Sequence, residues 1–432
     1  MDEKRRVPKR KGKSSYKKLN IKDKRKQYNA ATDSQEIKPS VMKKVNDFKA
    51  SGLTLLKGKK DEKKFKVNLR WIVSVVVAIV VIFSIVIVCN SPTGVVEYIS
   101  SKIALSKSGG SFPIEDNFSS GRKIYYSNGS LLVVTESDLK CFNKTGNLIY
   151  SRPHGFSDPV VKTSKIRTLI YGLNDSHYRI ETPEEEVISK KTENNMAVIS
   201  GDIANNGEYV LATEANEDIA LVTAFSKDGA ETFKYHSVNN YVTNVSISDN
   251  GSRLCVVSLS TKNAEFVSKI MIFNTDETKP FYTKELKGEV VYEASYSDSK
   301  NLCVLTNKQY MNIDDEVTST FKYNPEFLNK FEISDKYIIL YNTADSNSTK
   351  GNIYVLSKSG EQEAKFSIEN NVSDVSVYNG SIFTLGEKVI EYDFEGKRIK
   401  SSKISNGALK ISALSGGVAV LYPSKVDFIK EG

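Results

Sequence analysis

A polar turn followed by a strongly apolar strand recurs along the chain, and this repeat constrains the fold more than any other feature. Each turn is rich in Asn, Asp, Ser or Gly, residues that favour the positive φ angles of tight hairpins. The copies are YYSNGSLLVVT at 125–135, IANNGEYVLAT at 203–213, ISDNGSRLCVV at 247–257, YSDSKNLCVLT at 296–306, VYNGSIFTLG at 377–386 and ALSGGVAVLY at 413–422. Gly207 and Gly251 lie 44 residues apart and Gly380 and Gly416 lie 36 apart, so the period is near 40.

A second motif alternates with the first. In it, an apolar-alternating strand ends in an aromatic residue or Leu, and a short polar turn that closes in Gly follows. It occurs as LKCFNKTG at 139–146, LVTAFSKDG at 221–229, IYVLSKSG at 353–360 and IEYDFEG at 390–396, with a degenerate copy, IMIFNTDE, at 270–277. About four strands in each unit of about 40 residues are typical of a β-propeller. A repeat array of this length argues against the rival β-sandwich.

The repeats predict an all-β domain over residues 112–432, a β-propeller with eight blades. The units are expected to start near residues 123, 158, 197, 242, 290, 335, 372 and 408. Seven blades are the alternative, because the region 158–195 is poorly patterned. The last unit has room for three strands only. We expect residues 112–118, FPIEDNF, to supply the fourth strand, which would join the ends of the domain and remove an open sheet edge.

Residues 71–89, WIVSVVVAIVVIFSIVIVC, are 19 residues without a charge, Pro or Gly. A helix of this length spans about 28 Å, close to the hydrocarbon thickness of a bilayer. A cleaved signal peptide fits poorly, since the run is long and begins 70 residues into the chain. Basic residues stand just before the run, and an excess of Lys and Arg marks the cytoplasmic side. We therefore expect a single-pass cell-membrane protein, with residues 1–70 cytoplasmic and residues 90–432 extracytoplasmic.

The positive charge of the chain belongs to its first part. Residues 1–70 carry 24 Lys and Arg against 8 Asp and Glu, whereas residues 71–432 carry 37 against 44. Too few apolar side chains stand in this tail to offset backbone ordering, so a disordered cytoplasmic tail is predicted. Seven of its residues are expected to contact the anionic inner leaflet of the lipid bilayer. They are Lys57, Lys59, Lys60, Lys63, Lys64, Lys66 and Arg70.

Two short helical patterns flank the expected span. Val41, Val45 and Phe48 share one helix face, which predicts either an interfacial helix on the inner leaflet or a solvated linker. Residues 90–111 are expected to form a stalk. Within it, residues 95–105 predict a short helix with Val95, Ile99 and Ile103 on one face.

Residues that could carry chemistry form no recognisable pattern. The three cysteines of the propeller region, Cys141, Cys255 and Cys303, lie in strand-like runs and are predicted to be buried thiols. The three histidines, His154, His177 and His236, have no metal-binding spacing and are predicted to be surface residues. The sequence contains no P-loop, G-x-S-x-G or H-E-x-x-H motif. We therefore predict no catalytic, cofactor-binding or metal-binding residues.

Two motifs carry a resemblance to known families. ISDNGSRLCVV resembles the S-x-D-G-x-x-L motif of WD40-like and TolB-like propellers, with Asn250 inserted before Gly251. The second motif resembles the blade ends of PQQ-type propellers. The Trp docking motifs of quinone-dependent dehydrogenases are missing, since the one Trp is Trp71. Residues 65–432, with the Phe112-Pro113 pair at the domain start, are similar to an uncharacterised family of single-pass membrane proteins from Gram-positive bacteria. That resemblance implies a fold and no activity.

The sequence favours binding over catalysis. A propeller presents loops from every blade, which suits a scaffold of the cell envelope that binds an extracytoplasmic protein or glycan. A ligand-binding transmembrane sensor is the alternative, and an enzyme ranks third. The lipid bilayer is the other expected partner, and nucleic acid is disfavoured.

Overall fold

The computed structural model describes residues 73–82, 94–118, 123–323, 326–334, 336–345 and 348–432. The chain divides into two compact units, Met1–Val80 and Val81–Gly432. The predicted tail lies outside the described residues, and so do residues 71–72 and 83–89 of the expected span. Residues 73–82 are helical, and their side chains are exposed. Within the described residues, no helix is both long enough and apolar enough to cross a membrane.

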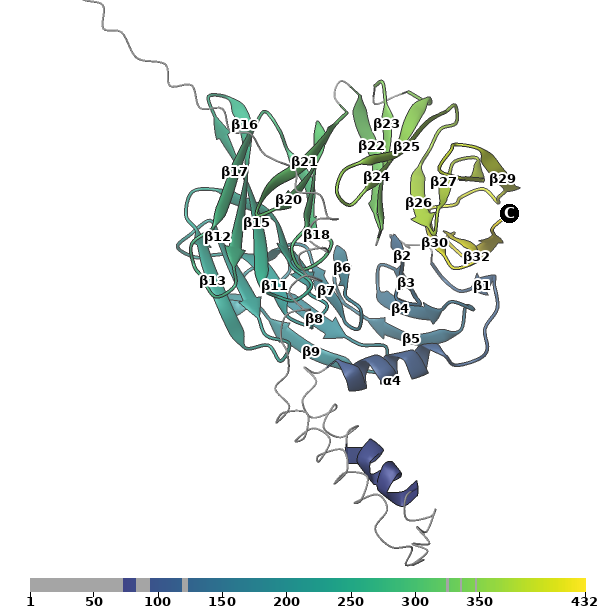
Figure 1. Cartoon of the computed structure of the whole chain (residues 1–432), viewed down its shortest axis with the longest axis horizontal. Coiled ribbons are helices and arrows are strands. Elements are labelled where there is room, and N and C mark those ends of the chain that lie inside the picture. The colour runs from purple at the N-terminus through teal and green to yellow at the C-terminus, as the bar shows by residue number, and fades with distance from the viewer. Residues whose placement is uncertain (1–72, 83–93, 119–122, 324–325, 335, 346–347) are drawn as a thin grey trace, which may run out of the picture. The chain divides into compact units, whose positions relative to one another are not determined.

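The second unit contains helix α4 (Val95–Leu105) and a ring of four-stranded antiparallel sheets (Figure 1). Blade 1 consists of β2 (Lys123–Ser127), β3 (Ser130–Val134), β4 (Asp138–Asn143) and β5 (Leu148–Pro153). Blade 2 consists of β6 (Pro159–Thr163), β7 (Thr168–Gly172), β8 (His177–Glu181) and β9 (Glu186–Lys191), followed by the 3-10 helix η1 (Glu193–Asn195). Blade 3 consists of β10 (Val198–Ile203), β11 (Tyr209–Glu214), β12 (Ala220–Phe225) and β13 (Glu231–Ser237).

The next three blades have the same order. Blade 4 consists of β14 (Tyr241–Ile247), β15 (Arg253–Lys262), β16 (Glu265–Asn274) and β17 (Tyr282–Lys287). Blade 5 consists of β18 (Val291–Tyr296), β19 (Leu302–Thr306), β20 (Gln309–Asp314) and β21 (Glu316–Lys322). Blade 6 consists of β22 (Phe327–Ile333), β23 (Tyr337–Thr343), β24 (Gly351–Ser357) and β25 (Gln362–Ile368).

The last two blades complete the ring. Blade 7 consists of β26 (Asp374–Tyr378), β27 (Ser381–Leu385), β28 (Lys388–Tyr392) and β29 (Arg398–Lys403). Blade 8 consists of β30 (Lys410–Leu414), β31 (Gly417–Leu421), β32 (Lys425–Lys430) and β1 (Ile114–Glu115). The predicted all-β propeller with eight blades is therefore confirmed. The region 158–195, on which the seven-blade alternative depended, is a full blade.

The two sequence motifs correspond to two kinds of turn. The first motif joins the first and second strands of a blade, and the second motif joins the third and fourth strands. In the first-motif turn of blade 1, Asn128 and Gly129 have φ angles of 53° and 92°, as this tight hairpin requires. In an antiparallel meander these two kinds of turn lie at the same end of the sheet. Both motifs therefore gather on one face of the propeller.

The hydrophobic core is divided among the contacts between neighbouring blades. Among the described residues, eight buried apolar clusters each draw side chains from two adjacent blades. In β3, Leu131 and Val133 pack against blade 8, whereas Leu132 and Val134 pack against blade 2. Successive residues of a strand point to opposite faces of its sheet. The second strand is mostly apolar along its buried part because both of its faces are covered.

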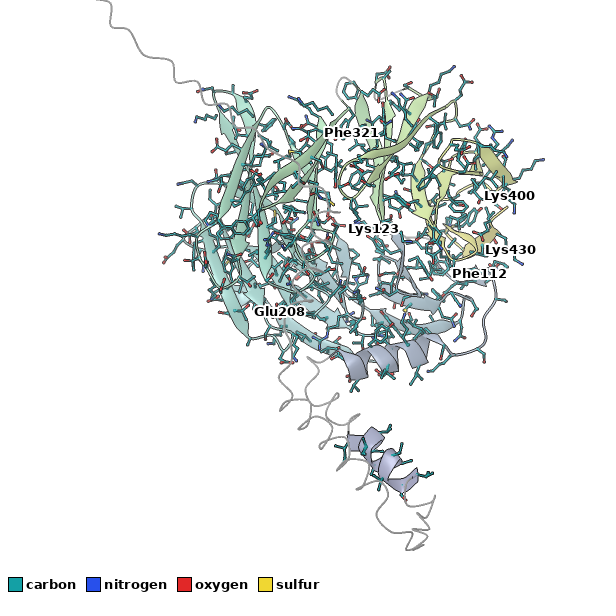
Figure 2. The ribbon with its side chains drawn as sticks, viewed as in Figure 1. Phe112, Lys123, Glu208, Phe321, Lys400 and Lys430 are labelled. Carbon is teal, nitrogen blue, oxygen red and sulfur yellow. The ribbon has the colours of Figure 1, made fainter. Side chains whose placement is uncertain are left out.

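The ends of the domain meet in blade 8, as the sequence predicted. Ile114 pairs with Val426 and Glu115 pairs with Lys425, so β1 supplies the fourth strand. Next to it, the ring of Phe112, which is labelled in Figure 2, stacks on that of Phe428 with the ring centres 5.1 Å apart. The expected start of the sixth unit near residue 335 is wrong. Strand β22 begins that blade at Phe327, because β22 pairs with β23 and belongs to a different sheet from β21.

The thiols and histidines test the predicted burial. Cys141, Cys255 and Cys303 are buried and free, as predicted. Burial raises the pKa of the Cys141 thiol to about 12, which makes it a poor nucleophile. His177 and His236 are exposed, as predicted.

The surface prediction for His154 is wrong. His154 is buried, its Nε2 lies 3.0 Å from the Thr135 carbonyl oxygen, and its Nδ1 accepts a hydrogen bond from the Phe156 amide. Backbone groups satisfy both ring nitrogens, which makes burial of the ring possible.

Phe118 tests the dependence of the ring on its closure. Its side chain is fully buried at the contact between blades 8 and 1, where it meets Phe142 edge-on. We predict that Phe118→Ala lowers the free energy of unfolding by about 3–5 kcal/mol, because it leaves a cavity in that core. Urea denaturation, monitored by far-UV circular dichroism, measures this loss. Phe281→Ala, at an exposed ring, is the matched control, and an equal effect of the two variants would contradict the prediction.

Candidate binding surfaces of the propeller

The first strand of each blade lies next to the central channel. First strands of neighbouring blades contact one another, as β10 does β14 and β30 does β2. The Val245 amide donates to Ser200 Oγ at 3.2 Å, and the Ile247 amide donates to Asp202 Oδ2 at 3.1 Å. Moving two residues along β10, from Ser200 to Asp202, moves the partner two residues in the same direction along β14, from Val245 to Ile247. The two strands therefore run parallel. Side chains of one blade thus satisfy the unpaired inner edge of the next.

The same bonds recur between blades 7 and 8. The Ile411 amide donates to Asp374 Oδ2 at 3.0 Å, and the Ala413 amide donates to Ser376 Oγ at 2.8 Å. Between blades 6 and 7, the Val377 amide donates to Glu332 Oε2 at 3.0 Å. Carboxylates and hydroxyls beside the channel therefore hold neighbouring blades together.

An ion pair crosses the channel. Lys162 Nζ of blade 2 lies 3.0 Å from Glu293 Oε1 of blade 5, three blades further round the ring. Burial opposes the charge of Lys162, but the Glu293 and Asp202 carboxylates outweigh it and raise the pKa of the lysine. Beside the pair, burial raises the pKa of Tyr171 to about 12, and its hydroxyl accepts a hydrogen bond from the Gly201 amide. Lys162 and Glu293 are thus paired with each other, and the Tyr171 hydroxyl is paired with the Gly201 amide.

A further lysine stands beside this pair. Lys123 of β2 lies toward the middle of the ring (Figure 2). Burial and the nearby Lys162 and Lys410 lower the pKa of Lys123, while Asp158 and Glu293 act in the opposite direction. The channel thus holds basic groups from blades 1, 2 and 8 together with acidic groups from blades 3, 5, 6 and 7.

Helix α4 is fixed to the face that carries the motif turns, which we call the α4 face. Glu97 accepts from Arg167 Nε at 2.9 Å and from Arg167 Nη2 at 2.7 Å, and Arg167 lies in the β6–β7 turn. Lys102 Nζ donates to the Asn128 carbonyl oxygen at 2.8 Å, in the β2–β3 turn. The helix therefore lies beside blades 1 and 2 (Figure 1).

The predicted helix at 95–105 is confirmed, and the structure shows which of its sides is buried. Ser101 and Ala104 are buried, whereas Ile99 and Ile103 of the predicted apolar face are 52% and 61% exposed. The pocket between α4 and the turns of blades 1 and 2 encloses about 30 Å³, room for about two water molecules.

Exposed aromatic side chains gather on the opposite face, which we call the far face. They are Tyr241 (68% exposed), Phe266 (56%), Tyr292 (49%) and Phe327 (55%), and together they form the aromatic surface. Tyr241, Tyr292 and Phe327 stand at or next to the start of the first strands of blades 4, 5 and 6. Phe266 lies on the β15–β16 hairpin, whose two strands have 10 residues each and extend beyond their neighbours.

Hydrogen bonds join the loops beneath the aromatic surface. The Gly288 amide donates to the Phe266 carbonyl oxygen at 2.8 Å, which links the β15–β16 hairpin to the loop before β18. In that loop, Glu289 accepts from Thr306 Oγ1 and from Gln309 Nε2, both at 2.9 Å. Thr306 in turn accepts, through its carbonyl oxygen, from the Tyr323 hydroxyl. Blades 4 and 5 and the approach to blade 6 therefore form one continuous surface.

A second carboxylate supports Phe327. Glu326 accepts from Asn352 Nδ2 at 2.8 Å and from the Tyr354 hydroxyl at 2.9 Å. These bonds tie the start of β22 to β24 of the same blade. The backbone that carries the exposed ring of Phe327 is thus fixed by the hydrogen bonds of its neighbour Glu326.

The seven basic residues predicted to contact the membrane lie outside the described residues. Within the described residues, no group of three or more His, Cys, Asp or Glu side chains is placed to hold a metal ion. Sequence reasoning missed the aromatic surface. Its signal was a large aromatic residue at the start of a first strand, among polar neighbours, as in NNYVTN at 239–244.

Glu332, which accepts a hydrogen bond from the Val377 amide between blades 6 and 7, provides a test of the hydrogen bonds beside the channel. Burial and the nearby Asp374 raise the pKa of Glu332 to about 8 from an ordinary 4.5. Stability that depends on the protonated acid is fully present below about pH 4.5 and is lost as the pH rises through 8. We predict that the free energy of unfolding falls by roughly 4 kcal/mol between about pH 5 and pH 9.

Glu332→Gln should remove most of that fall, because the amide cannot ionise and can still accept from Val377. Urea unfolding at several pH values measures the difference. Glu363→Gln, at an exposed side chain of β25, is the control. Equal pH slopes for the native protein and Glu332→Gln would contradict the assigned pKa.

Comparisons with known proteins agree with the observed fold. No curated protein matches the sequence. Among solved structures, Saccharomyces cerevisiae Sqt1 has a TM-score of 0.54 at 10% identity, over 75% of this chain and all of that one. The C-terminal WD40 domain of Sif2 gives the same values. The quinohemoprotein alcohol dehydrogenase ADHIIG from Pseudomonas putida HK5 has a TM-score of 0.50 at 9% identity, over 75% of this chain and 72% of that one.

At these identities the likenesses concern the fold alone. The sequence match is more specific, since residues 107–430 fit the model described as a family of unknown function, DUF5711. This range includes every strand of the propeller. The chain therefore belongs to the family of unknown function DUF5711, and its propeller resembles those of WD40 proteins.

Proposed function

We propose that this protein is a membrane-anchored, extracytoplasmic propeller that binds a protein or a glycan as a scaffold of the cell envelope. The observation that carries the proposal is the aromatic surface, four exposed rings on three neighbouring blades. Aromatic side chains are enriched at protein interfaces and offer flat apolar faces against which sugar rings can pack. The held loops beneath them supply a preorganised surface, which lowers the entropy lost on binding.

We assign binding to the faces of the propeller and not catalysis to its channel. Asp202, Glu332 and Asp374 each accept backbone hydrogen bonds from the next blade. Lys162 and Glu293 pair with each other. Such bonds give these groups a structural role, since each satisfies a buried partner.

The anchor in this proposal is the apolar run at 71–89, with residues 1–70 in the cytoplasm. The chain enters the propeller through α4, on the α4 face. An anchored propeller would therefore turn its far face, with the aromatic surface, away from the membrane. A partner in the cell envelope could then reach the exposed rings.

Photocrosslinking in living cells tests the proposed binding surface. We predict that p-benzoylphenylalanine at Tyr241 or Phe327 gives discrete crosslinked products on irradiation, because a partner covers these rings. A product of defined mass indicates a protein, and a glycosidase-sensitive ladder indicates a glycan. The same amino acid at Phe281, an exposed ring in the β16–β17 connection on the α4 face, is the control. No product at either test position, or equal products at Phe281, would overturn the assignment.

The basic segment before the run tests membrane contact. We predict that a peptide of residues 41–70 binds vesicles of anionic lipid and not of neutral lipid, because each basic residue near an anionic surface contributes about 1 kcal/mol. Replacing Lys59, Lys60, Lys63 and Lys64 by Gln should weaken binding at least about tenfold. Vesicle sedimentation at low and physiological salt measures both effects. Equal binding by the Gln variant would limit the basic residues to setting topology.

A further inference from the structure

We propose that α4 lies on the outer surface of the lipid bilayer, with Val96, Ile99 and Ile103 inserted between the head groups. The helix would thereby hold the α4 face of the propeller against the membrane. This inference rests on the proposed anchoring through residues 71–89. It adds a second contact with the bilayer, made by the folded domain itself.

The apolar stripe of α4 is unpartnered within the described residues. Val96, Ile99 and Ile103 are 58%, 52% and 61% exposed. At about 100° per residue they lie within about 60° of one another, on one side of the helix. An exposed apolar stripe beside polar residues such as Ser100 and Lys102 is typical of helices that lie in a membrane interface.

The opposite side of α4 is fixed to the propeller. Ser101 and Ala104 are each 5% exposed, and the Glu97–Arg167 ion pair lies on the same side. Arg167 also donates to the Lys227 carbonyl oxygen at 2.6 Å, which ties the pair to blade 3. The helix cannot rotate to bury its apolar stripe without breaking these bonds. The stripe therefore has a fixed direction relative to the blades.

The position of α4 in the chain favours the bilayer as the partner that covers its apolar stripe. Only five residues, 90–94, separate the end of the apolar run from Val95. Five residues span at most about 18 Å, so an anchored chain keeps α4 close to the membrane surface. Tyr98, 45% exposed, has Lys102 Nζ above its ring at 5.4 Å, and Tyr and Lys are both common at membrane interfaces.

Charge alone does not select the bilayer. The exposed side chains around α4 include Lys107, Lys144 and Lys165, but also Glu184 and Glu185 of the β8–β9 turn. The apolar stripe must therefore carry the contact, and neutral lipid should suffice for it. This expectation separates α4 from the basic segment at 57–70, which requires anionic lipid.

Depth-dependent quenching in the full-length chain tests the inference. In a Cys89→Ser background, single cysteines at Ile99 or Ile103 are labelled with the environment-sensitive fluorophore NBD, while the native thiols of the propeller stay buried. The protein is reconstituted into phosphatidylcholine vesicles. Nitroxide-labelled lipid should quench the probe at Ile99 at least about twofold more than a probe at Val238→Cys. Val238 is 60% exposed on the far face, and its probe should be quenched by iodide present on both sides of the membrane.

An alkaline carbonate wash separates the two proposals. Release of the chain from the vesicles would overturn the anchoring, whatever the probes report. Retention with iodide quenching at both Ile99 and Ile103 would overturn the contact of α4 with lipid and leave the anchor standing. Protection of both probes from iodide and from lipid nitroxide, with energy transfer between copies, would assign the stripe to a second copy of the chain and overturn the lipid contact. Lipid quenching at either position, with none at Val238, supports the inference.

Discussion

Packing between neighbouring blades is the interaction on which the rest of the structure depends. The second strand of each blade has no solvent-facing side, so its residues belong alternately to two cores. In β15, Leu254 and Val256 join the core shared with blade 3, while Cys255 and Val257 join the core shared with blade 5. Each blade is therefore stabilised from both sides, and closure of the ring gives blades 1 and 8 the same two contacts as the others. This explains why a two-residue strand, β1, completes the last sheet.

The polar groups beside the channel solve a second problem of the same architecture. The inner edge of each first strand has no neighbouring strand, and its amides need acceptors. Ser200, Asp202, Glu332, Asp374 and Ser376 provide them from the preceding blade. The position of these carboxylates and hydroxyls thus follows from the geometry of the ring. The two faces of the propeller are not subject to this requirement.

The sequence predicted the repeated elements well, because each blade carries the same local chemistry. The Asn-Gly turns, the apolar second strands and the closure by residues 112–118 follow from the hairpins and from alternation. The boundary near 335 failed because no Gly turn separates EVTSTFK in β21 from FLNKFEI in β22. His154 failed because its partners are backbone groups, which a search for side-chain motifs does not detect. The aromatic surface was missed because periodicity alone does not tell which first-strand residues a loop leaves uncovered, although an aromatic residue among polar neighbours marked its position.

The attachment of α4 has a mechanical consequence. In the chain order, α4 precedes the short strand β1, whose pairing with β32 closes the ring. A pulling force that enters from the N-terminal side meets the Glu97–Arg167 ion pair and the Lys102–Asn128 hydrogen bond before it reaches β1. Load is thereby diverted into blades 1 and 2, and the two-residue closure is spared. The contacts of α4 with blades 1 and 2 therefore shield the pairing of β1 with β32 from a force applied along the chain.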